Sequence, residues 1–231
     1  MKNDDLFSKD TADNYDGRWE KVAALKGALN LSTQLVLTEL PADARLLCVG
    51  AGTGAELRHL AAAFPGWRFT VVEPAPAMMA RCQAAVRADG IEQRCDFHAG
   101  YLDTLPEGPA HDAATCLLVT HFLPAAGQLG LLRQLAGRLR PGGTLVCAAL
   151  VGDAASVDAL RPAWDSMLRL AALPDARRER MLTFDEVHIL PLEEVSALAV
   201  IAGFEEPTLF LQTLLIHGWF ARRADHGGGA G

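Results

Sequence analysis

Three closely spaced glycines followed by an acid are the residues of this sequence with the clearest chemical meaning. Gly50, Gly52 and Gly54 follow one apolar run, and a second apolar run, about twenty residues later, ends at Glu73. Glycine lets a backbone turn sharply and approach a ligand closely, where a Cβ atom would clash. An acid at the end of the second run is placed to accept hydrogen bonds from the two vicinal hydroxyls of a ribose. The spacing therefore predicts the ribose-binding half of a nucleotide-type pocket.

The glycine spacing alone leaves the ligand open. Gly50-x-Gly52-x-x-Ala55 also fits the dinucleotide fingerprint, which tolerates alanine at its last position. A dinucleotide-dependent reductase is one interpretation, although the chain has no Tyr-x-x-x-Lys pair. The glycines could also form only a tight structural turn from a strand into a helix. The elements that follow them decide between these hypotheses.

Strands and helices are predicted to alternate through the middle of the chain. The segment from Tyr15 to Leu40 has helical periodicity and is ended by Pro41-Ala42-Asp43. The alternation from Ala44 to Leu150 predicts a doubly wound α/β sheet of mostly parallel strands. The expected elements are strands Leu46–Val49, Phe69–Val72, Ala113–Val119 and Thr144–Leu150 and helices Ala55–Phe64, Ala77–Asp89 and Gly127–Leu139. Ligands of such sheets lie beyond the carboxyl ends of the strands, where the glycines and the acid stand.

The pattern changes after Leu150. An amphipathic helix is expected from Val157 to Ala171, followed by Pro174-Asp175 and a charged segment. The remaining expectations are a last helix, Leu192–Ala202, two strand-like runs, Leu209–Gln212 and Ile216–Ala221, and a disordered glycine-rich tail at 224–231.

This series of elements resembles the class I S-adenosylmethionine (SAM)-dependent methyltransferases, from roughly Tyr15 to Arg222. Besides the glycines and Glu73, the resemblance is carried by Asp103 with Leu105-Pro106, Thr120-His121-Phe122-Leu123, Arg140-Pro141-Gly142-Gly143 and Ala202-Gly203-Phe204. It implies a Rossmann-like, doubly wound, mostly parallel seven-stranded sheet with an antiparallel C-terminal hairpin. It also implies SAM as cofactor, and in-line transfer of its electrophilic methyl group to an oxygen, nitrogen or carbon nucleophile.

The resemblance also divides the chain, which its length suggests is a single domain, into parts. These are an N-terminal helical cap (1–43), the SAM-binding α/β core (44–150), a variable insert (151–194), and the last helix with the closing hairpin (195–223). In similar methyltransferases, insertions after the fifth strand often build a lid over the substrate. We therefore expect residues 151–194 to cover the acceptor.

The cofactor is expected along the carboxyl ends of the first strands. The residues implied to hold its methionine part are Gly50, Ala51, Gly52, Thr53 and Gly54, and those implied near its adenosine are Glu73, Pro74 and Met78. Met78 could equally be a core residue. Many relatives carry an acid after the glycine that ends the third strand, but here Tyr101 follows Gly100. Tyr101 is favoured to contact the adenine, with Asp103 or the backbone N–H of Leu102 as alternatives, and simple packing of Tyr101 over the loop also stays open.

The exit of the fourth strand is the expected acceptor side. In the family, backbone carbonyls around Leu117 receive the methionine ammonium of SAM. His121 is the first candidate for a base or an acceptor-positioning group, because its ordinary pKa lies near neutrality; packing is the alternative. Tyr15 could cover SAM, and Arg18 could pair with its carboxylate. The alternative for both is an amphipathic helix with Trp19 in the core.

Composition narrows the partners. The formal net charge is −7, which argues against broad nucleic-acid affinity. Half of the residues are hydrophobic, yet no apolar run is long enough to span a membrane, and the charged N-terminus has no signal-peptide pattern. The five cysteines are scattered and show no zinc-binding spacing, which predicts no metal and a cytoplasmic location. We expect a small-molecule acceptor, with a homodimer possible.

Two alternatives to a small-molecule methyltransferase remain. The motif Pro76-Ala77-Met78-Met79-Ala80-Arg81-Cys82 and the other motifs above distantly resemble carboxy-SAM synthase. The chain departs from that subgroup at Leu198 and Cys116, where its members carry an arginine and an asparagine. The other alternative is a non-catalytic subunit of the same fold, which an exposed apolar patch would mark. An Asn/Asp-Pro-Pro-Tyr/Phe motif, typical of enzymes that methylate base or glutamine nitrogens, is missing after the fourth strand.

Overall fold

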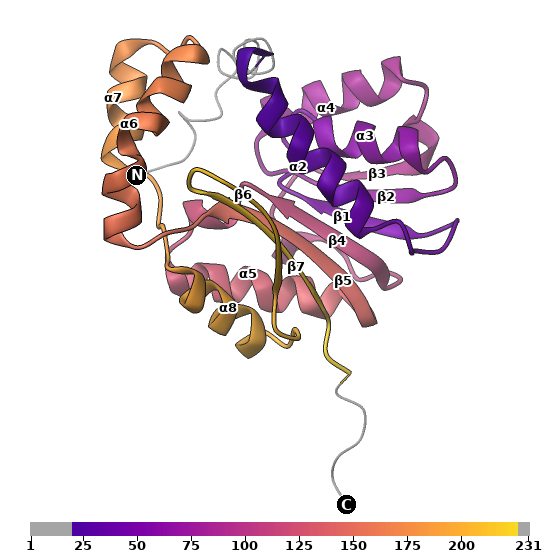
Figure 1. The fold of residues 1–231 in the computed structure, drawn as a ribbon. Coiled ribbons are helices and arrows are strands. Elements are labelled where there is room, and N and C mark those ends of the chain that lie inside the picture. The colour runs from indigo at the N-terminus through magenta and orange to yellow at the C-terminus, as the bar shows by residue number, and fades with distance from the viewer. Residues whose placement is uncertain (1–19, 226–231) are drawn as a thin grey trace, which may run out of the picture.

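The computed structural model describes residues 20–225, and their core is one seven-stranded sheet (Figure 1). The strands are β1 Arg45–Val49, β2 Arg68–Val72, β3 Cys95–His98, β4 His111–Leu117, β5 Leu139–Leu150, β6 Thr208–Thr213 and β7 Ile216–Arg222. Their order is β3-β2-β1-β4-β5-β7-β6. The pairs among β1 to β5 are parallel, whereas β7 runs antiparallel to both β5 and β6. The predicted Rossmann-like sheet with an antiparallel C-terminal hairpin is confirmed.

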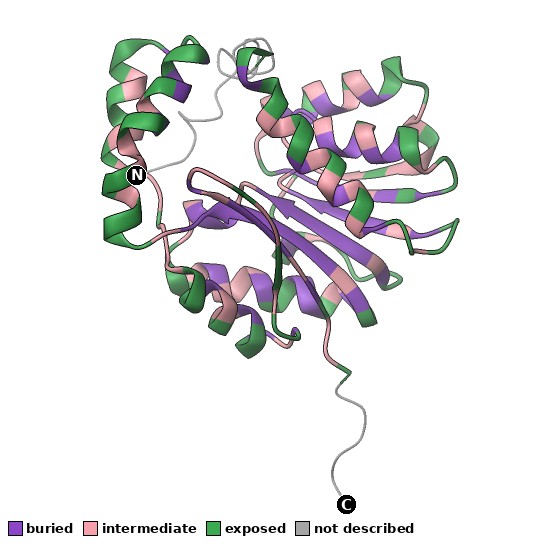
Figure 2. Cartoon of the chain, viewed as in Figure 1, coloured by how far each residue is buried: buried purple, intermediate pink, exposed green. Residues whose placement is uncertain are grey.

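Helices cover both faces of this sheet. Three of them, α2 Ala23–Val36, α3 Ala55–Ala63 and α4 Pro76–Ala88, lie on one face, and α5 Ala125–Arg138 and α8 Leu192–Ile201 lie on the other (Figure 1). Because helices shield both faces, the central strands are apolar throughout rather than alternating. Figure 2 shows this as a continuous buried band through the centre of the sheet.

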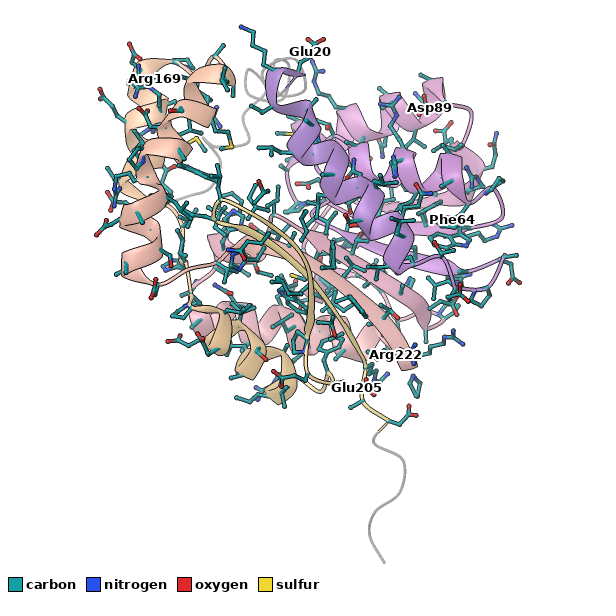
Figure 3. The ribbon with its side chains drawn as sticks, in the orientation of Figure 1. Glu20, Phe64, Asp89, Arg169, Glu205 and Arg222 are labelled. Carbon is teal, nitrogen blue, oxygen red and sulfur yellow. The ribbon has the colours of Figure 1, made fainter. Side chains whose placement is uncertain are left out.

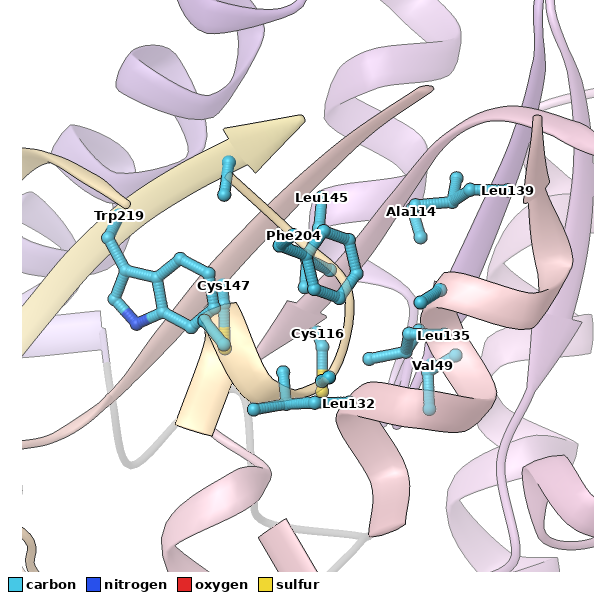
Figure 4. Close-up of a cluster of buried hydrophobic side chains, with 14 of the residues drawn as sticks. Val49, Ala114, Cys116, Leu132, Leu135, Leu139, Leu145, Cys147, Phe204 and Trp219 are labelled. Atoms are coloured by element: carbon cyan, nitrogen blue, oxygen red, sulfur yellow. The ribbon is translucent and has the colours of Figure 1, made fainter. Parts of the chain in front are cut away.

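One of the two main cores lies between the sheet and the helices α5 and α8. Trp219 of β7 lies at one side of it, Phe204 lies in the middle of the labelled side chains, and Leu132 of α5 packs beneath the strands (Figure 4). Cys116 and Cys147 are neighbours in register on β4 and β5 and are free, buried thiols. They pack as small apolar side chains, as their positions in predicted strands indicated.

Two helices beyond β5 form a separate lobe at the carboxyl edge of the sheet. The first, α6 Ala154–Leu170, matches the expected amphipathic helix, and the second, α7 Asp175–Thr183, is formed by the charged segment (Figure 1). Figure 3 shows Arg169 on this lobe, opposite Asp89 at the far end of α4. The helices are joined by Arg178, which forms an ion pair of 2.5 Å with Asp165 of α6.

Several strand boundaries differ from the sequence-based prediction by a few residues, and two of the differences have a clear backbone cause. The fourth strand was expected to reach Val119 but ends at Leu117, because Leu118 adopts the left-handed φ of 61°. The fifth strand begins at Leu139 rather than Thr144, and a shift in its register between His111 and Ala113 of β4 accommodates the Pro-Gly-Gly turn. Both differences reflect local backbone geometry within otherwise correct elements.

Candidate functional site

The three glycines of the turn after β1 differ in what surrounds them. All three have left-handed φ values: 70° at Gly50, 55° at Gly52 and 83° at Gly54. A Cβ atom on Gly50 would lie 2.3 Å from Cγ2 of Val119, and one on Gly54 would lie 2.7 Å from Sγ of Cys82. A Cβ atom on Gly52 would meet no heavy atom within 4 Å. Gly50 and Gly54 are therefore required by the fold, whereas the open side of Gly52 leaves room for a ligand to approach the backbone.

Glu73 joins the end of β2 to this turn. Its Oε2 atom accepts a hydrogen bond of 2.9 Å from the Gly52 N–H, and its Oε1 atom accepts one of 2.9 Å from the Ala75 N–H. The side chain is only 6% exposed, and burial raises the pKa of its carboxyl while the two backbone hydrogen bonds oppose that shift. Each oxygen keeps a second lone pair, so the carboxylate can still accept bonds from vicinal hydroxyls.

The other residues implied near the adenosine are placed differently from one another. Pro74 is exposed, whereas the Met78 side chain is 1% exposed in the first turn of α4, as the core alternative predicts. Tyr101 is 66% exposed, so most of its surface is open to solvent. Its carbonyl accepts a hydrogen bond of 2.8 Å from the Thr104 hydroxyl. Leu102 is buried beside it in the core. The backbone of Tyr101 is thus fixed by a hydrogen bond, whereas its ring is exposed.

His121 follows β4 in a short 3-10 turn, Thr120–Phe122. Burial lowers the pKa of its imidazole from 6.5 to about 4, so the ring is neutral near pH 7. Its Nδ1 atom accepts a hydrogen bond of 3.4 Å from the Leu150 N–H. This contact assigns the hydrogen of the neutral ring to Nε2, so the ring offers a donor rather than a free base.

The insert is attached to this turn by backbone contacts that the sequence analysis did not identify. The His188 N–H donates a hydrogen bond of 2.6 Å to the His121 carbonyl. Gln128, buried on α5, donates from Nε2 to the carbonyl oxygens of Leu123, at 3.0 Å, and His188, at 3.1 Å. A buried glutamine on a core helix face could have indicated such a link, because a buried amide needs partners.

A second residue missed from the sequence is Glu56, in the first turn of α3. It is buried, and its carboxylate accepts a hydrogen bond of 2.7 Å from the Thr115 hydroxyl of β4. Burial is the main cause that raises the pKa of Glu56 from 4.5 to about 7. An acid directly after a glycine turn could have been predicted to favour the positive end of the helix dipole.

The structure thus gathers Gly50 to Gly54, Glu73, Leu117 and His121 at one edge of the sheet. Gly50 donates a hydrogen bond of 2.8 Å to the Val72 carbonyl and lies against Val119, so the turns after β1, β2 and β4 touch. Tyr15 and Arg18 lie outside the described residues. No group of three His, Cys, Asp or Glu side chains able to hold a metal ion occurs between residues 20 and 225. No helix in that same range is both long and apolar enough to cross a membrane.

Comparison with known proteins shows that this chain is similar to methyltransferases. Residues 47–145 match the model of a methyltransferase domain family. Acetylserotonin O-methyltransferase of Mus musculus is 34% identical over 193 residues, which are 81% of this chain and 45% of that protein. The chain thus spans about half the length of the curated relatives it matches.

Solved structures agree on the fold. The SAM-dependent methyltransferase SibL, in its apo form, aligns with 88% of this chain and 57% of its own at a TM-score of 0.67 and 22% identity. Human N-acetylserotonin methyltransferase in complex with SAM aligns with 91% of this chain and 58% of its own at a TM-score of 0.59 and 17% identity.

Residues 47–145 thus form a methyltransferase domain, and the described structure has the fold of the class I SAM-dependent enzymes. The expectations of this superfamily and of SAM are confirmed. The open side of Gly52 and the two remaining lone pairs of Glu73 fit that cosubstrate. The comparisons lend the more distant likeness to carboxy-SAM synthase no specific support, and Leu198, where that subgroup has arginine, packs against the core.

Proposed function

We propose that this chain transfers the methyl group of SAM to an oxygen nucleophile of a small molecule. The observation that carries the proposal is the junction in which the Gly52 N–H binds Glu73 beside the open side of Gly52. The choice of oxygen, among the oxygen, nitrogen and carbon nucleophiles that the sequence leaves open, follows relatives named as O-methyltransferases.

The residues of the chain have separate tasks in this proposal. SAM supplies a methyl group that is already electrophilic, so the protein needs to bind, orient and exclude water. The backbone of Gly50, Ala51, Gly52, Thr53 and Gly54 faces the methionine part, with the Leu117 carbonyl opposite. Glu73 accepts from the ribose hydroxyls. Pro74, Tyr101 and Leu102 border the adenine, and Tyr101 offers an exposed ring for stacking.

His121 positions the acceptor rather than removing its proton; when the acceptor oxygen takes the methyl group, S-adenosylhomocysteine leaves and the hydroxyl proton passes to water. Its ring is neutral near pH 7, and its Nδ1 atom is occupied by the Leu150 N–H. The Nε2–H group can then donate to an acceptor oxygen. The insert at 151–194 forms the acceptor side. Tyr15, Arg18, the division of the chain into parts, a homodimer and a cytoplasmic location stay predictions from the sequence.

Calorimetric titration with SAM, S-adenosylhomocysteine, carboxy-SAM and NAD(P)H tests the proposal. We expect dissociation constants of about 1–100 μM for SAM and S-adenosylhomocysteine and no binding of NAD(P)H. A panel of phenols and alcohols, with N-acetylserotonin as the first member, then tests methyl transfer by mass spectrometry. Preference for carboxy-SAM would overturn the methyl-transfer proposal. Binding without transfer to any nucleophile would favour a non-catalytic subunit, and no binding at all would leave only the fold.

A further inference from the structure

A cavity of about 340 Å³ lies at the carboxyl edge of the sheet, between the start of α6 and the segment that follows α7. Gly152, just beyond β5, forms part of its wall, and no residue of the glycine turn does. The volume is at the lower end of the range of about 300–1,000 Å³ that is usual for small-ligand sites. The cavity suits one compact molecule and not a polymer.

Most of the lining is apolar. Val157 of α6 and Val187 and Ile189 of the following segment contribute aliphatic surface, and Phe184 contributes a ring. Phe184 ends α7 with a left-handed φ of 57°, a conformation that costs a non-glycine residue energy. Its ring lies 5.4 Å from the Arg161 guanidinium and 6.3 Å from the Trp164 ring. These contacts hold the ring in the wall of the cavity.

The charged groups of the lining do not cancel. Asp153, Asp158 and Arg161 all line the cavity. Arg161 is engaged by Asp158, at 2.9 Å, and by the Leu182 carbonyl. Asp153 caps α6 by accepting a hydrogen bond of 2.8 Å from the Ser156 N–H, and within residues 20–225 it forms no ion pair. The Ser156 contact also lowers the pKa of Asp153, so the carboxylate is ionised at neutral pH. The lining therefore carries one uncompensated negative charge.

The cavity wall is attached to the residues around the methyl-transfer site. His188 stands between Val187 and Ile189, and its N–H donates to the His121 carbonyl at 2.6 Å. The Gly152 N–H donates to the Leu190 carbonyl at 3.0 Å. The segment that lines the cavity is thus hydrogen-bonded to the turn after β4 through its backbone.

We propose that this cavity holds the methyl acceptor, and that the acceptor has a compact apolar body and a protonated amine placed against the Asp153 carboxylate. The inference rests on the proposed function. The apolar body would contact Phe184 and the aliphatic residues, and the amine would supply the missing positive charge. A carboxylate in the same position would face like charge.

Three probes of one shape test this assignment: phenethylamine, 2-phenylethanol and 3-phenylpropionate, which are cationic, neutral and anionic. Each is titrated by ligand-observed NMR into the full chain with S-adenosylhomocysteine present. We expect phenethylamine to bind most tightly and 3-phenylpropionate not to bind. Asp153→Asn should weaken the binding of phenethylamine about twofold to fivefold, because Asp153 is exposed and an exposed charge pair is worth less than a buried one. The binding of 2-phenylethanol should not change.

The variants are chosen so that folding does not confuse the result. Asparagine still caps a helix, so Asp153→Asn removes charge and keeps the start of α6. Asp175→Asn, at the start of α7, removes the same charge from a side chain that is 85% exposed, away from the cavity, and should change nothing. Val187→Phe should fill the cavity and block the binding of phenethylamine and 2-phenylethanol.

The inference is overturned if Asp153→Asn binds phenethylamine as wild type does, or if 3-phenylpropionate binds equally well. Binding of phenethylamine and 2-phenylethanol by Val187→Phe as tightly as by wild type would overturn it too. Binding of S-adenosylhomocysteine without binding of phenethylamine would sink the inference and leave the proposed function standing. If S-adenosylhomocysteine itself fails to bind, the proposed function fails, and the amine titration still decides what the cavity takes.

Discussion

Replacing Gly52 by alanine tests whether the glycine turn is shaped by a ligand or only by the chain. Gly52 has a φ of 55°, and a Cβ atom built on it meets no heavy atom within 4 Å. The substitution therefore introduces backbone strain without a clash inside the protein. A left-handed alanine costs about 1–2 kcal/mol. For a chain of this length, that cost lowers the melting temperature by about 2–8 °C.

Gly90 provides a matched control. It follows α4, has a φ of 71°, and its added Cβ atom also meets nothing within 4 Å. Gly52→Ala and Gly90→Ala should therefore lose the same stability in a thermal melt. In calorimetry, only Gly52→Ala should weaken SAM binding, by at least about tenfold, or about 1.4 kcal/mol, because the added methyl group projects into the space through which the ligand is proposed to approach.

Equal SAM affinities for the two variants would refute this argument. Gly50→Ala gives a further check, because its Cβ atom would overlap Val119. We expect it to be less stable than either of the others. If the melting temperatures of Gly50→Ala and Gly90→Ala are equal, packing of the turn against the end of β4 is not the reason that position 50 requires glycine.

Three further predictions concern buried polar groups. Gln128→Met removes the donor that holds the His188 carbonyl, so it should raise the rate of amide hydrogen exchange around His188 and leave SAM affinity within about twofold. Gln134→Met, at an exposed position of the same helix, is the control. Equal exchange rates in the two variants would contradict this prediction. The free energy of unfolding of Glu56→Gln, measured in urea, should rise relative to that of wild type by up to about 3 kcal/mol between pH 4.5 and pH 7. The reason is that folding raises the pKa of Glu56 from 4.5 to about 7, so wild type loses stability as pH rises through that window. The free energy of unfolding of His121→Asn should rise relative to that of wild type by up to about 3 kcal/mol as pH falls from 6.5 to 4. The reason is that folding lowers the pKa of His121, so the unfolded ring of wild type takes up a proton first and wild type loses stability. If a variant's free energy of unfolding follows the same pH dependence as that of wild type, the corresponding prediction is wrong.

The sheet and the cofactor edge could be predicted because residue types encode them. Glycine is the residue that accepts a left-handed φ, and Gly50, Gly52 and Gly54 all adopt one. The strand that ends at Glu73 is buried because helices cover both faces of the sheet, and continuous apolar runs reveal such strands. These features are visible in residue type and in the order of residues along the chain.

The boundaries that failed depend on geometry that the residue type does not announce. Leu118 is an ordinary apolar residue, yet its left-handed φ ends β4 two residues before the expected Val119. The helix α7 lacks an apolar face that would predict it. Its Arg178 instead pairs with Asp165, 13 residues earlier on α6, and such a partner is known only once both helices are placed.

The donor and acceptor halves of the site differ in how far sequence can define them, and the chemistry explains why. SAM has a fixed shape and charge, so the turn and the acid proposed to hold it are specified by residue type. The proposed acceptor side is connected largely by main-chain groups: the His188 N–H donates to the His121 carbonyl, and the Gly152 N–H donates to the Leu190 carbonyl. Any residue supplies those groups, so the sequence leaves no trace of them. What distinguishes one acceptor from another must then come from the few side chains that reach the cavity, and among its charged groups only Asp153 lacks an ionic partner in the described structure.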